Sequence, residues 1–147
     1  MKKLMFIFNP RSGREQIRGQ LMGILETFTK AGYDIHVHAT QCQLDCMEWV
    51  KNYGDRMDIL VVSGGDGTLN EAISGLMELE NPPLLGYIPA GSTNDFATSL
   101  GLPKQMQEAA DGIVEGSPYP IDIGRFCKDR YFCLLYTSDA ADDTPCV

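Results

Sequence analysis

The sequence predicts an α/β fold of the Rossmann-like or flavodoxin-like type, in which a doubly wound parallel sheet forms the middle of three αβα layers. Short apolar runs of strand length alternate along the chain with segments whose apolar residues recur at helical spacing. Three of the expected strands end in turns rich in glycine and small polar residues. Because the carboxyl ends of parallel strands meet at one edge of a sheet, we expect these turns to converge there and to form a ligand site.

The first strand and the first helix are expected at the start of the chain. Lys3–Phe8 is an apolar run typical of a buried strand, and the polar turn Asn9–Gly13 follows it. The next segment predicts a helix that continues to about Lys30, and Gly32 is the residue expected to end it. The apolar face of this helix is formed by Ile17, Leu21, Ile24, Leu25 and Phe28.

The second strand and helix follow directly. Tyr33–Thr40 alternates between apolar and polar residues, which predicts a strand with Ile35 and Val37 pointing inward. A helix is expected from about Leu44 to Tyr53, ended by Gly54. Its apolar residues are Leu44, Met47, Trp49 and Val50, and we assign Met47 and Trp49 to the core by default.

The third strand leads into the most glycine-rich turn of the chain. Asp58–Val62 is a β-branched run of strand length, and the turn Ser63–Asn70 follows it. The apolar residues of Leu69–Met77 recur at helical spacing. Thr68 and Glu71 are three residues apart, as in a capping box, so we expect the helix to start at Thr68.

The last part of the chain repeats the strand–turn–helix order once and then changes to strands. Leu84–Ile88 predicts a fourth strand, closed by the polar turn Pro89–Asp95. The elements expected after it are a short helix up to Leu100, a helix over Gln105–Val114, and a pair of strands over Tyr119–Phe126 and Arg130–Cys133.

Composition excludes several classes of partner. With 147 residues and a net charge of −8, the chain has the size of one domain and no basic stripe that could bind nucleic acid. The same charge disfavours strong adhesion to anionic membranes. No apolar run approaches the ~20 residues of a membrane helix, and Leu4–Phe8 is too short for the core of a signal peptide. We therefore expect a cytoplasmic protein.

The five cysteines form no paired CxxC spacing, and their number is odd. In a cytoplasmic chain the default is reduced, partly buried thiols. Cys42 and Cys46, together with His36 and His38, would gather a metal only if the four side chains converged, and nothing in the spacing requires that. No metal ligand is assigned from the sequence.

The turn Gly64–Asn70 has the features of a phosphate-binding loop. Its three glycines allow backbone N–H groups to approach a ligand closely, and the N-terminus of the following helix favours an anion. Asp66 would repel a phosphate unless a cation lay between them, which indicates a magnesium-bound nucleotide. The alternative is a tight turn in which Asp66 is only a solvated turn residue.

The other two turns offer further donors. In the first, Ser12 and Gly13 can present a hydroxyl and backbone amides to a phosphate, whereas Asn9 and Pro10 are expected to shape the turn. Arg11 or Arg14 either pairs with phosphate or marks a solvated helix start. In the turn after the fourth strand, Ser92 can donate a hydroxyl, as can Thr93, while Asn94 and Asp95 are alternatively helix caps. Neither a GxxxxGK[ST] loop nor a GxGxxG fingerprint occurs in these turns.

Taken together, the turns resemble the catalytic domain of the diacylglycerol kinase-like lipid kinases, and most closely the soluble bacterial diacylglycerol kinases. The resemblance covers residues 1–133, and the order and spacing of its motifs make it specific. Its motifs are Asn9-Pro-Arg-Ser-Gly13, Gly64-Gly-Asp-Gly-Thr-Leu-Asn70-Glu71, Ile88-Pro-Ala-Gly-Ser-Thr-Asn-Asp-Phe-Ala97, Ile121-Asp-Ile-Gly124 and Arg130-Tyr-Phe132.

The resemblance implies that the chain binds ATP with Mg²⁺ and transfers the γ-phosphoryl group to a lipid hydroxyl, most simply that of diacylglycerol, to give phosphatidic acid. It implies a catalytic role for Asp66 and transient contact with the membrane that holds the lipid. A homodimer would be unsurprising for such a relative. The residues that the resemblance assigns to ATP binding are Asn9, Pro10, Arg11, Ser12, Gly13, Thr40, Gly64, Gly65, Asp66, Gly67, Thr68, Leu69, Asn70 and Ser92.

Two departures from the family pattern limit what carries over. Family members continue into a β-rich second domain that holds the general base and further magnesium ligands, so residues 1–133 are expected to be an incomplete catalytic domain that is inactive alone. Residues 134–147 have neither strand nor helix period and are expected to be artefactual sequence or a disordered acidic tail. The alternatives are a kinase of the same superfamily for sphingoid base, ceramide or NAD, or a non-catalytic nucleotide-binding module.

Overall fold

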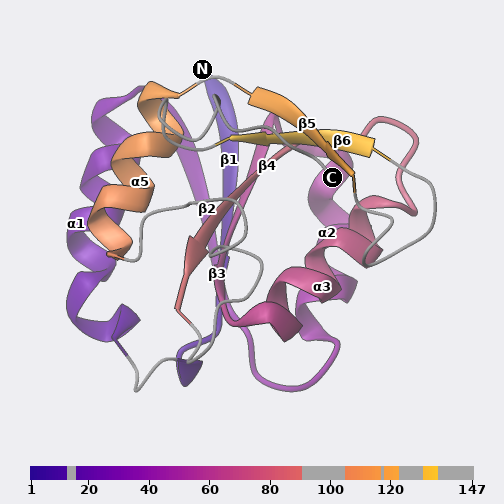
Figure 1. Ribbon diagram of the computed structural model, residues 1–147, viewed down its shortest axis with the longest axis horizontal. Coiled ribbons are helices and arrows are strands. Elements are labelled where there is room, and N and C mark those ends of the chain that lie inside the picture. The colour runs from indigo at the N-terminus through magenta and orange to yellow at the C-terminus, as the bar shows by residue number, and fades with distance from the viewer. Residues whose placement is uncertain (13–15, 91–104, 117, 123–130, 136–147) are drawn as a thin grey trace.

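The computed structural model describes residues 1–12, 16–90, 105–116, 118–122 and 131–135, and these contain six strands in one sheet (Figure 1). The strand order is β2-β1-β3-β4-β6-β5. The elements are β1 (Lys2–Phe8), α1 (Ile17–Lys30), β2 (Tyr33–Ala39), α2 (Asp45–Tyr53), η2 (Gly54–Arg56), β3 (Ile59–Gly64), α3 (Asp66–Leu76), β4 (Leu84–Pro89), α5 (Met106–Glu115), β5 (Pro118–Asp122) and β6 (Tyr131–Leu135).

The predicted α/β fold is confirmed, and one end of the sheet is mixed. Strands β2, β1, β3 and β4 are mutually parallel, and β6 is parallel to β4. Strand β5 runs antiparallel to β6, with residues 123–130 between them in the chain. That connection is shorter than the dozen or more residues of a parallel crossover, so an antiparallel pair is the expected outcome. Strand β6 also extends through Leu134 and Leu135.

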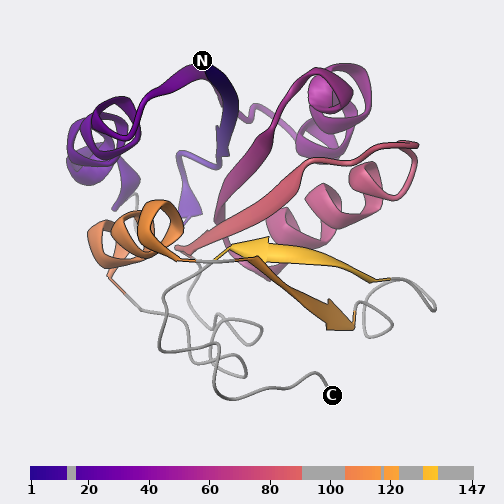
Figure 2. The same ribbon diagram turned by 90° about the horizontal axis from the view of Figure 1, so that it is seen from above.

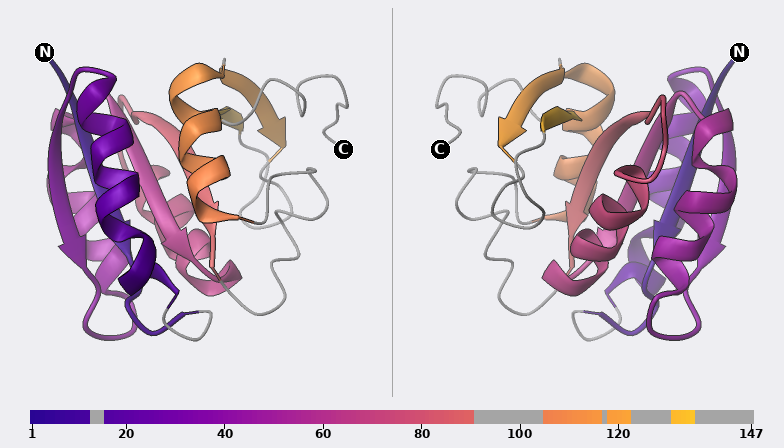
Figure 3. Two further views of the ribbon diagram at one scale, coloured as in Figure 1. Left: turned by 90° about the vertical axis from the view of Figure 1, so that its left-hand side faces the viewer. Right: turned by 90° about the vertical axis from the view of Figure 1, so that its right-hand side faces the viewer.

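Helices cover both faces of the sheet. Helices α1 and α5 lie side by side on one face, and α2 and α3 lie on the other (Figures 2 and 3). The strand residues alternate between the two cores: in β3, Ile59 and Val61 pack under α1 and α5, while Leu60 and Val62 pack under α2 and α3. Within the described residues, no helix combines the length and the apolar character needed to cross a bilayer.

Helix α1 ends as its sequence predicts. Ile17, Ile24 and Phe28 are fully buried beneath it, and the more peripheral Leu21 and Leu25 pack against the same core. The helix stops before Gly32, whose φ of 94° lies in the left-handed region that glycine adopts at low cost.

Val37 and Leu44 are more exposed than the sequence pattern predicts, and the inward assignment of Val37 is wrong. Val37 is 45% exposed, because β2 is the edge strand and has a neighbour on only one side. Leu44 precedes α2 and is 50% exposed, so it does not belong to the apolar face of that helix. Trp49 is only partly buried, and its ring stacks on His38 with 3.9 Å between centroids.

Helices α2 and α3 approach each other at a glycine. A Cβ atom built on Gly75 of α3 would lie 2.8 Å from Cβ of Val50 and 2.9 Å from the carbonyl oxygen of Met47, both in α2. Neither contact atom is the flexible end of a side chain, so the two helices would have to move apart. Gly75 therefore sets the spacing of this layer.

We expect Gly75→Ala to destabilise the protein by about 1–3 kcal/mol, although alanine is the better helix former. The matched control is Gly19→Ala in the exposed first turn of α1, where an added Cβ meets nothing within 4 Å. That control should stabilise the fold by about 0.5–1 kcal/mol. Urea unfolding of the two variants measures both effects, and a Gly75→Ala protein as stable as Gly19→Ala would refute the close approach.

Candidate functional site

A pocket of about 410 Å³ opens at the carboxyl edge of the sheet, where β1, β2 and β3 end. The first and third strands contribute the turns that the sequence predicts there, and the end of β2 joins them. Residues 91–95 of the turn after β4, and the short helix expected up to Leu100, lie outside the described residues. The pocket is lined by Asn9, Arg11, Ser12, Thr40, Gln41, Cys42, Gln43, Cys46, Gly65, Gly67, Thr68 and Glu71.

Asn9 shapes the first turn, as expected. Its side-chain Oδ1 accepts the N–H of Arg11 at 2.9 Å, and its carbonyl accepts the N–H of Ser12 at 3.2 Å. The N–H of Asn9 donates to the carbonyl of Ser63 in β3 at 3.0 Å, which ties the turn to the neighbouring strand. The exposed Arg11 and the half-buried Ser12 thereby reach the pocket from a fixed backbone.

The third turn places the N-terminus of a helix at the pocket. Helix α3 begins at Asp66, after an extended Gly65, and no side chain caps it. The capping box of Thr68 and Glu71 is therefore wrong, because Glu71 Oε2 instead accepts the N–H of Leu44 at 3.1 Å. The helix start leaves backbone N–H groups of its first turn beside the pocket, which is the arrangement that binds anions.

The glycines of this turn serve different purposes. A Cβ on Gly64 would lie 2.6 Å from Thr68 Oγ1 and 2.7 Å from Thr68 Cβ, so Gly64 is required by the packing of the turn itself. A Cβ on Gly67 would meet nothing within 4 Å, although Gly67 lines the pocket. Among the described residues, no protein contact requires a glycine at position 67. The missing side chain leaves space for a ligand to approach the helix.

Asp66 is the first residue of α3 and is half-buried. The pKa of the Tyr87 hydroxyl in β4 is raised, chiefly because the group is buried and in addition because of the negative charge of Asp66. That hydroxyl stays protonated and donates to the carbonyl of Gly64 at 2.8 Å. Tyr87 therefore holds the end of β3 in place through the carbonyl of Gly64. Sequence reasoning missed this role, although a tyrosine in a buried strand is expected to need a hydrogen-bond partner.

The end of β2 supplies a larger part of the pocket than the sequence predicts. Thr40 lines it as expected, and its N–H donates to the carbonyl of Phe8 at 2.9 Å. The lining residues that sequence reasoning missed are Gln41, Cys42, Gln43, Cys46 and Glu71.

The two cysteines in the pocket differ in their surroundings. Cys42 is exposed, whereas Cys46 is fully buried. Burial, followed by the charges of Glu71 and Asp45, raises the pKa of the Cys46 thiol, so it stays a neutral thiol. The pocket therefore has one reachable and one inert sulfur among the residues that line it.

The remaining assigned residues do not line the pocket. The side chain of Leu69 is fully buried in the core under α2 and α3, and its N–H donates to the carbonyl of Gly65 at 3.2 Å. Pro10, Gly64, Asp66 and Asn70 lie next to lining residues in the chain without lining the pocket themselves. The candidates that lie outside the described residues are Gly13, Arg14, Ser92, Thr93, Asn94 and Asp95.

Comparison with known proteins gives consistent matches. Residues 3–126 match the family model of the diacylglycerol kinase catalytic domain. The chain is 45% identical over 134 residues to a diacylglycerol kinase of Bacillus subtilis (strain 168), covering 90% of this chain and 44% of that protein. It is 40% identical over 135 residues to a diacylglycerol kinase of Staphylococcus aureus (strain MRSA252), covering 91% of this chain and 42% of the other.

The fold has the same relatives. A crystal structure of a diacylglycerol kinase from Bacillus anthracis str. Sterne superposes with a TM-score of 0.76 and 34% sequence identity, over 82% of this chain and 44% of that one. The chain thus spans less than half the length of the relatives it matches. Because the family model matches most of the chain, the chain belongs to the diacylglycerol kinase catalytic domain family.

Proposed function

We propose that this chain is the nucleotide-binding part of an ATP-dependent lipid kinase, which transfers the γ-phosphoryl group of ATP to a lipid hydroxyl. The observation that carries the proposal is the pocket between the Asn9–Ser12 turn and the N-terminus of α3. Membership of the diacylglycerol kinase catalytic domain family supports the interpretation of this pocket as a kinase's nucleotide site. The relatives' names favour diacylglycerol as the acceptor, with phosphatidic acid as the product.

The groups around the pocket suit a triphosphate. Arg11 brings a guanidinium, which can bind two phosphate oxygens at once, and Ser12 brings a hydroxyl donor. The N-terminus of α3 adds backbone N–H groups, and Gly67 leaves them accessible. Phosphoryl transfer depends chiefly on positioning and on neutralising charge, which are the functions that such groups provide.

The residues present also fit a magnesium ion that arrives with the nucleotide. Among the described residues, no three histidine, cysteine or acidic side chains cluster closely enough to hold a metal ion. Mg²⁺ commonly binds through one or two carboxylates together with phosphate oxygens and water. Asp66, which lies between the lining residues Gly65 and Gly67 in the chain, would provide such a carboxylate. When bound, Mg²⁺ would neutralise phosphate charge and allow Asp66 to face the nucleotide without repulsion.

The acceptor is proposed from the family and from the relatives' names. Family resemblance assigns the general base to a second domain, so we propose that residues 1–147 bind nucleotide without transferring phosphate. Sphingoid base, ceramide and NAD remain the alternative acceptors, and a non-catalytic nucleotide-binding module is the alternative from another class. For the longer enzyme we propose a cytoplasmic protein that contacts the membrane transiently and can form a homodimer.

We expect Gly67→Ala to weaken Mg·ATP binding about tenfold while leaving the fold at least as stable as the wild type, since the new Cβ would meet no protein atom and alanine is the better helix former. Isothermal titration calorimetry measures the affinity, and thermal unfolding measures the stability. The control is Gly19→Ala, which lies in α1 away from the pocket lining and should bind like the wild type. Equal affinity in the two variants would mean that phosphate does not approach this helix turn.

We expect Asp66→Ala to abolish the difference between ATP affinity measured with Mg²⁺ and with EDTA, because the variant lacks the carboxylate proposed to face the cation. The fold should remain intact, as judged by circular dichroism. Asp34→Ala removes one negative charge from the exposed face of β2 and serves as the control. An Asp66→Ala protein that keeps its magnesium dependence would contradict the proposed cation bridge.

We expect no phosphatidic acid when the 147-residue chain is incubated with Mg·ATP and diacylglycerol in mixed micelles. The diacylglycerol kinase of Bacillus subtilis is the positive control, assayed under the same conditions. Sphingosine and NAD are tested in parallel as acceptors. Phosphorylation of any of the three by this chain would contradict the proposal that it binds nucleotide without transferring phosphate. The acceptor used would then identify the substrate class.

A further inference from the structure

The segment between β2 and α2 forms one side of the pocket without belonging to a helix or a strand. We call Thr40–Gln43 the pocket wall, since all four of its residues line the cavity. The next residue, Leu44, has a φ of 71°, the only positive φ of a non-glycine residue in the described part of the chain. This backbone conformation is unfavourable for leucine. Because the Leu44 side chain is half exposed, its packing offsets little of the conformational cost.

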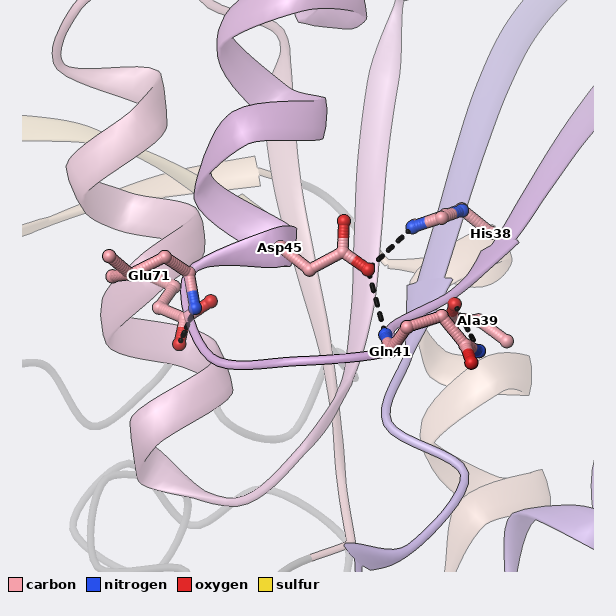
Figure 4. A network of polar contacts seen from close by, with 6 residues as sticks. His38, Ala39, Gln41, Asp45 and Glu71 are labelled. Atoms are coloured by element: carbon pink, nitrogen blue, oxygen red, sulfur yellow. Dashed lines mark hydrogen bonds and ion pairs between the residues drawn. The ribbon is translucent and has the colours of Figure 1, made fainter.

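Two carboxylates hold the wall in place. Oδ2 of Asp45, the first residue of α2, accepts the N–H of Gln41 at 2.7 Å. Oε2 of Glu71 in α3 accepts the N–H of Leu44 at 3.1 Å. Figure 4 shows the two carboxylates on either side of the segment, one from each helix of this layer. Strained backbone persists where its surroundings determine it, and these two bonds supply that determination.

Asp45 is itself held from the side of the sheet. Nε2 of His38 lies 3.0 Å from the same Oδ2 that accepts the Gln41 N–H (Figure 4). Only 17% of the His38 side chain and 14% of the Asp45 side chain are exposed, so the contact is shielded from solvent. The His38 ring also stacks on Trp49 of α2, with an interplanar angle of 18°. Neither His38 nor Asp45 lines the pocket.

We propose that Asp45, oriented by His38, is a positioning residue for nucleotide binding. It fixes the backbone of the pocket wall in the conformation that receives the ligand, so that little ordering remains to be done on binding. The inference rests on the proposed function, because it assigns the wall to the nucleotide. It adds two residues that touch no ligand and act only through Gln41.

The test is the affinity for Mg·ATP, measured by calorimetry well below the melting temperature of each variant. Asp45→Ala should raise the Kd about tenfold, because the bond lost is one to a charged group and the wall is no longer held in the binding conformation. Asp45→Asn keeps an oxygen for the Gln41 N–H and should bind with a Kd close to that of the wild type. The matched control is Asp34→Ala. It breaks the exposed Asp34–His36 pair on β2, the strand that also carries His38, and should leave the Kd unchanged.

Rescue by asparagine separates positioning from stability, because a lowered melting temperature alone does not change the Kd of a protein that remains folded. If Asp45→Ala does not fold, His38→Phe carries the test, since it keeps a ring on Trp49 and removes the contact to Asp45. We expect that variant to weaken binding about threefold. Unchanged affinity in Asp45→Ala, or in His38→Phe where that variant replaces it, overturns the positioning role. Failure of the wild type to bind Mg·ATP overturns the proposed function instead.

Discussion

The parallel register of the first strands is the constraint on which the pocket depends. Phe8 of β1 lies opposite Ala39 of β2 on one side and Ser63 of β3 on the other, so three strand ends stop at one level. Residues that are far apart in the chain therefore meet at one edge of the sheet. Backbone hydrogen bonds across this edge, from Asn9 to Ser63 and from Thr40 to Phe8, extend the register into the turns.

The fold and the convergence of the turns could be predicted because they follow from local patterns. Apolar periodicity predicts the helices and strands, and the glycine-bearing turns predict the edge of the sheet at which the pocket lies. The errors arose where a local pattern competed with a partner distant in the sequence. Glu71 matches a capping box, yet the N–H of Leu44 is the partner that it binds. Val37 alternates correctly, yet its strand lies at the edge of the sheet.

The pocket wall was the least predictable part of the site. Gln41, Cys42 and Gln43 belong to no motif, and their position depends on Asp45 and Glu71, which come from two different helices. The turn after β3 could be predicted because glycine marks it in the sequence. Two of its glycines nevertheless have different roles: Gly64 makes room for the side chain of Thr68, whereas Gly67 borders open space at the pocket. A sequence pattern does not distinguish these two uses.

The stack of Trp49 on His38 has a practical consequence. Trp49 is the only tryptophan of the chain, and its ring lies 3.9 Å from the imidazole that contacts Asp45. Indole emission depends strongly on what lies against the ring, so the tryptophan fluorescence of this protein reports on the surroundings of His38 and Asp45. The molecule therefore carries its own optical probe of that anchor, and movement of the wall can be followed in solution without any attached label.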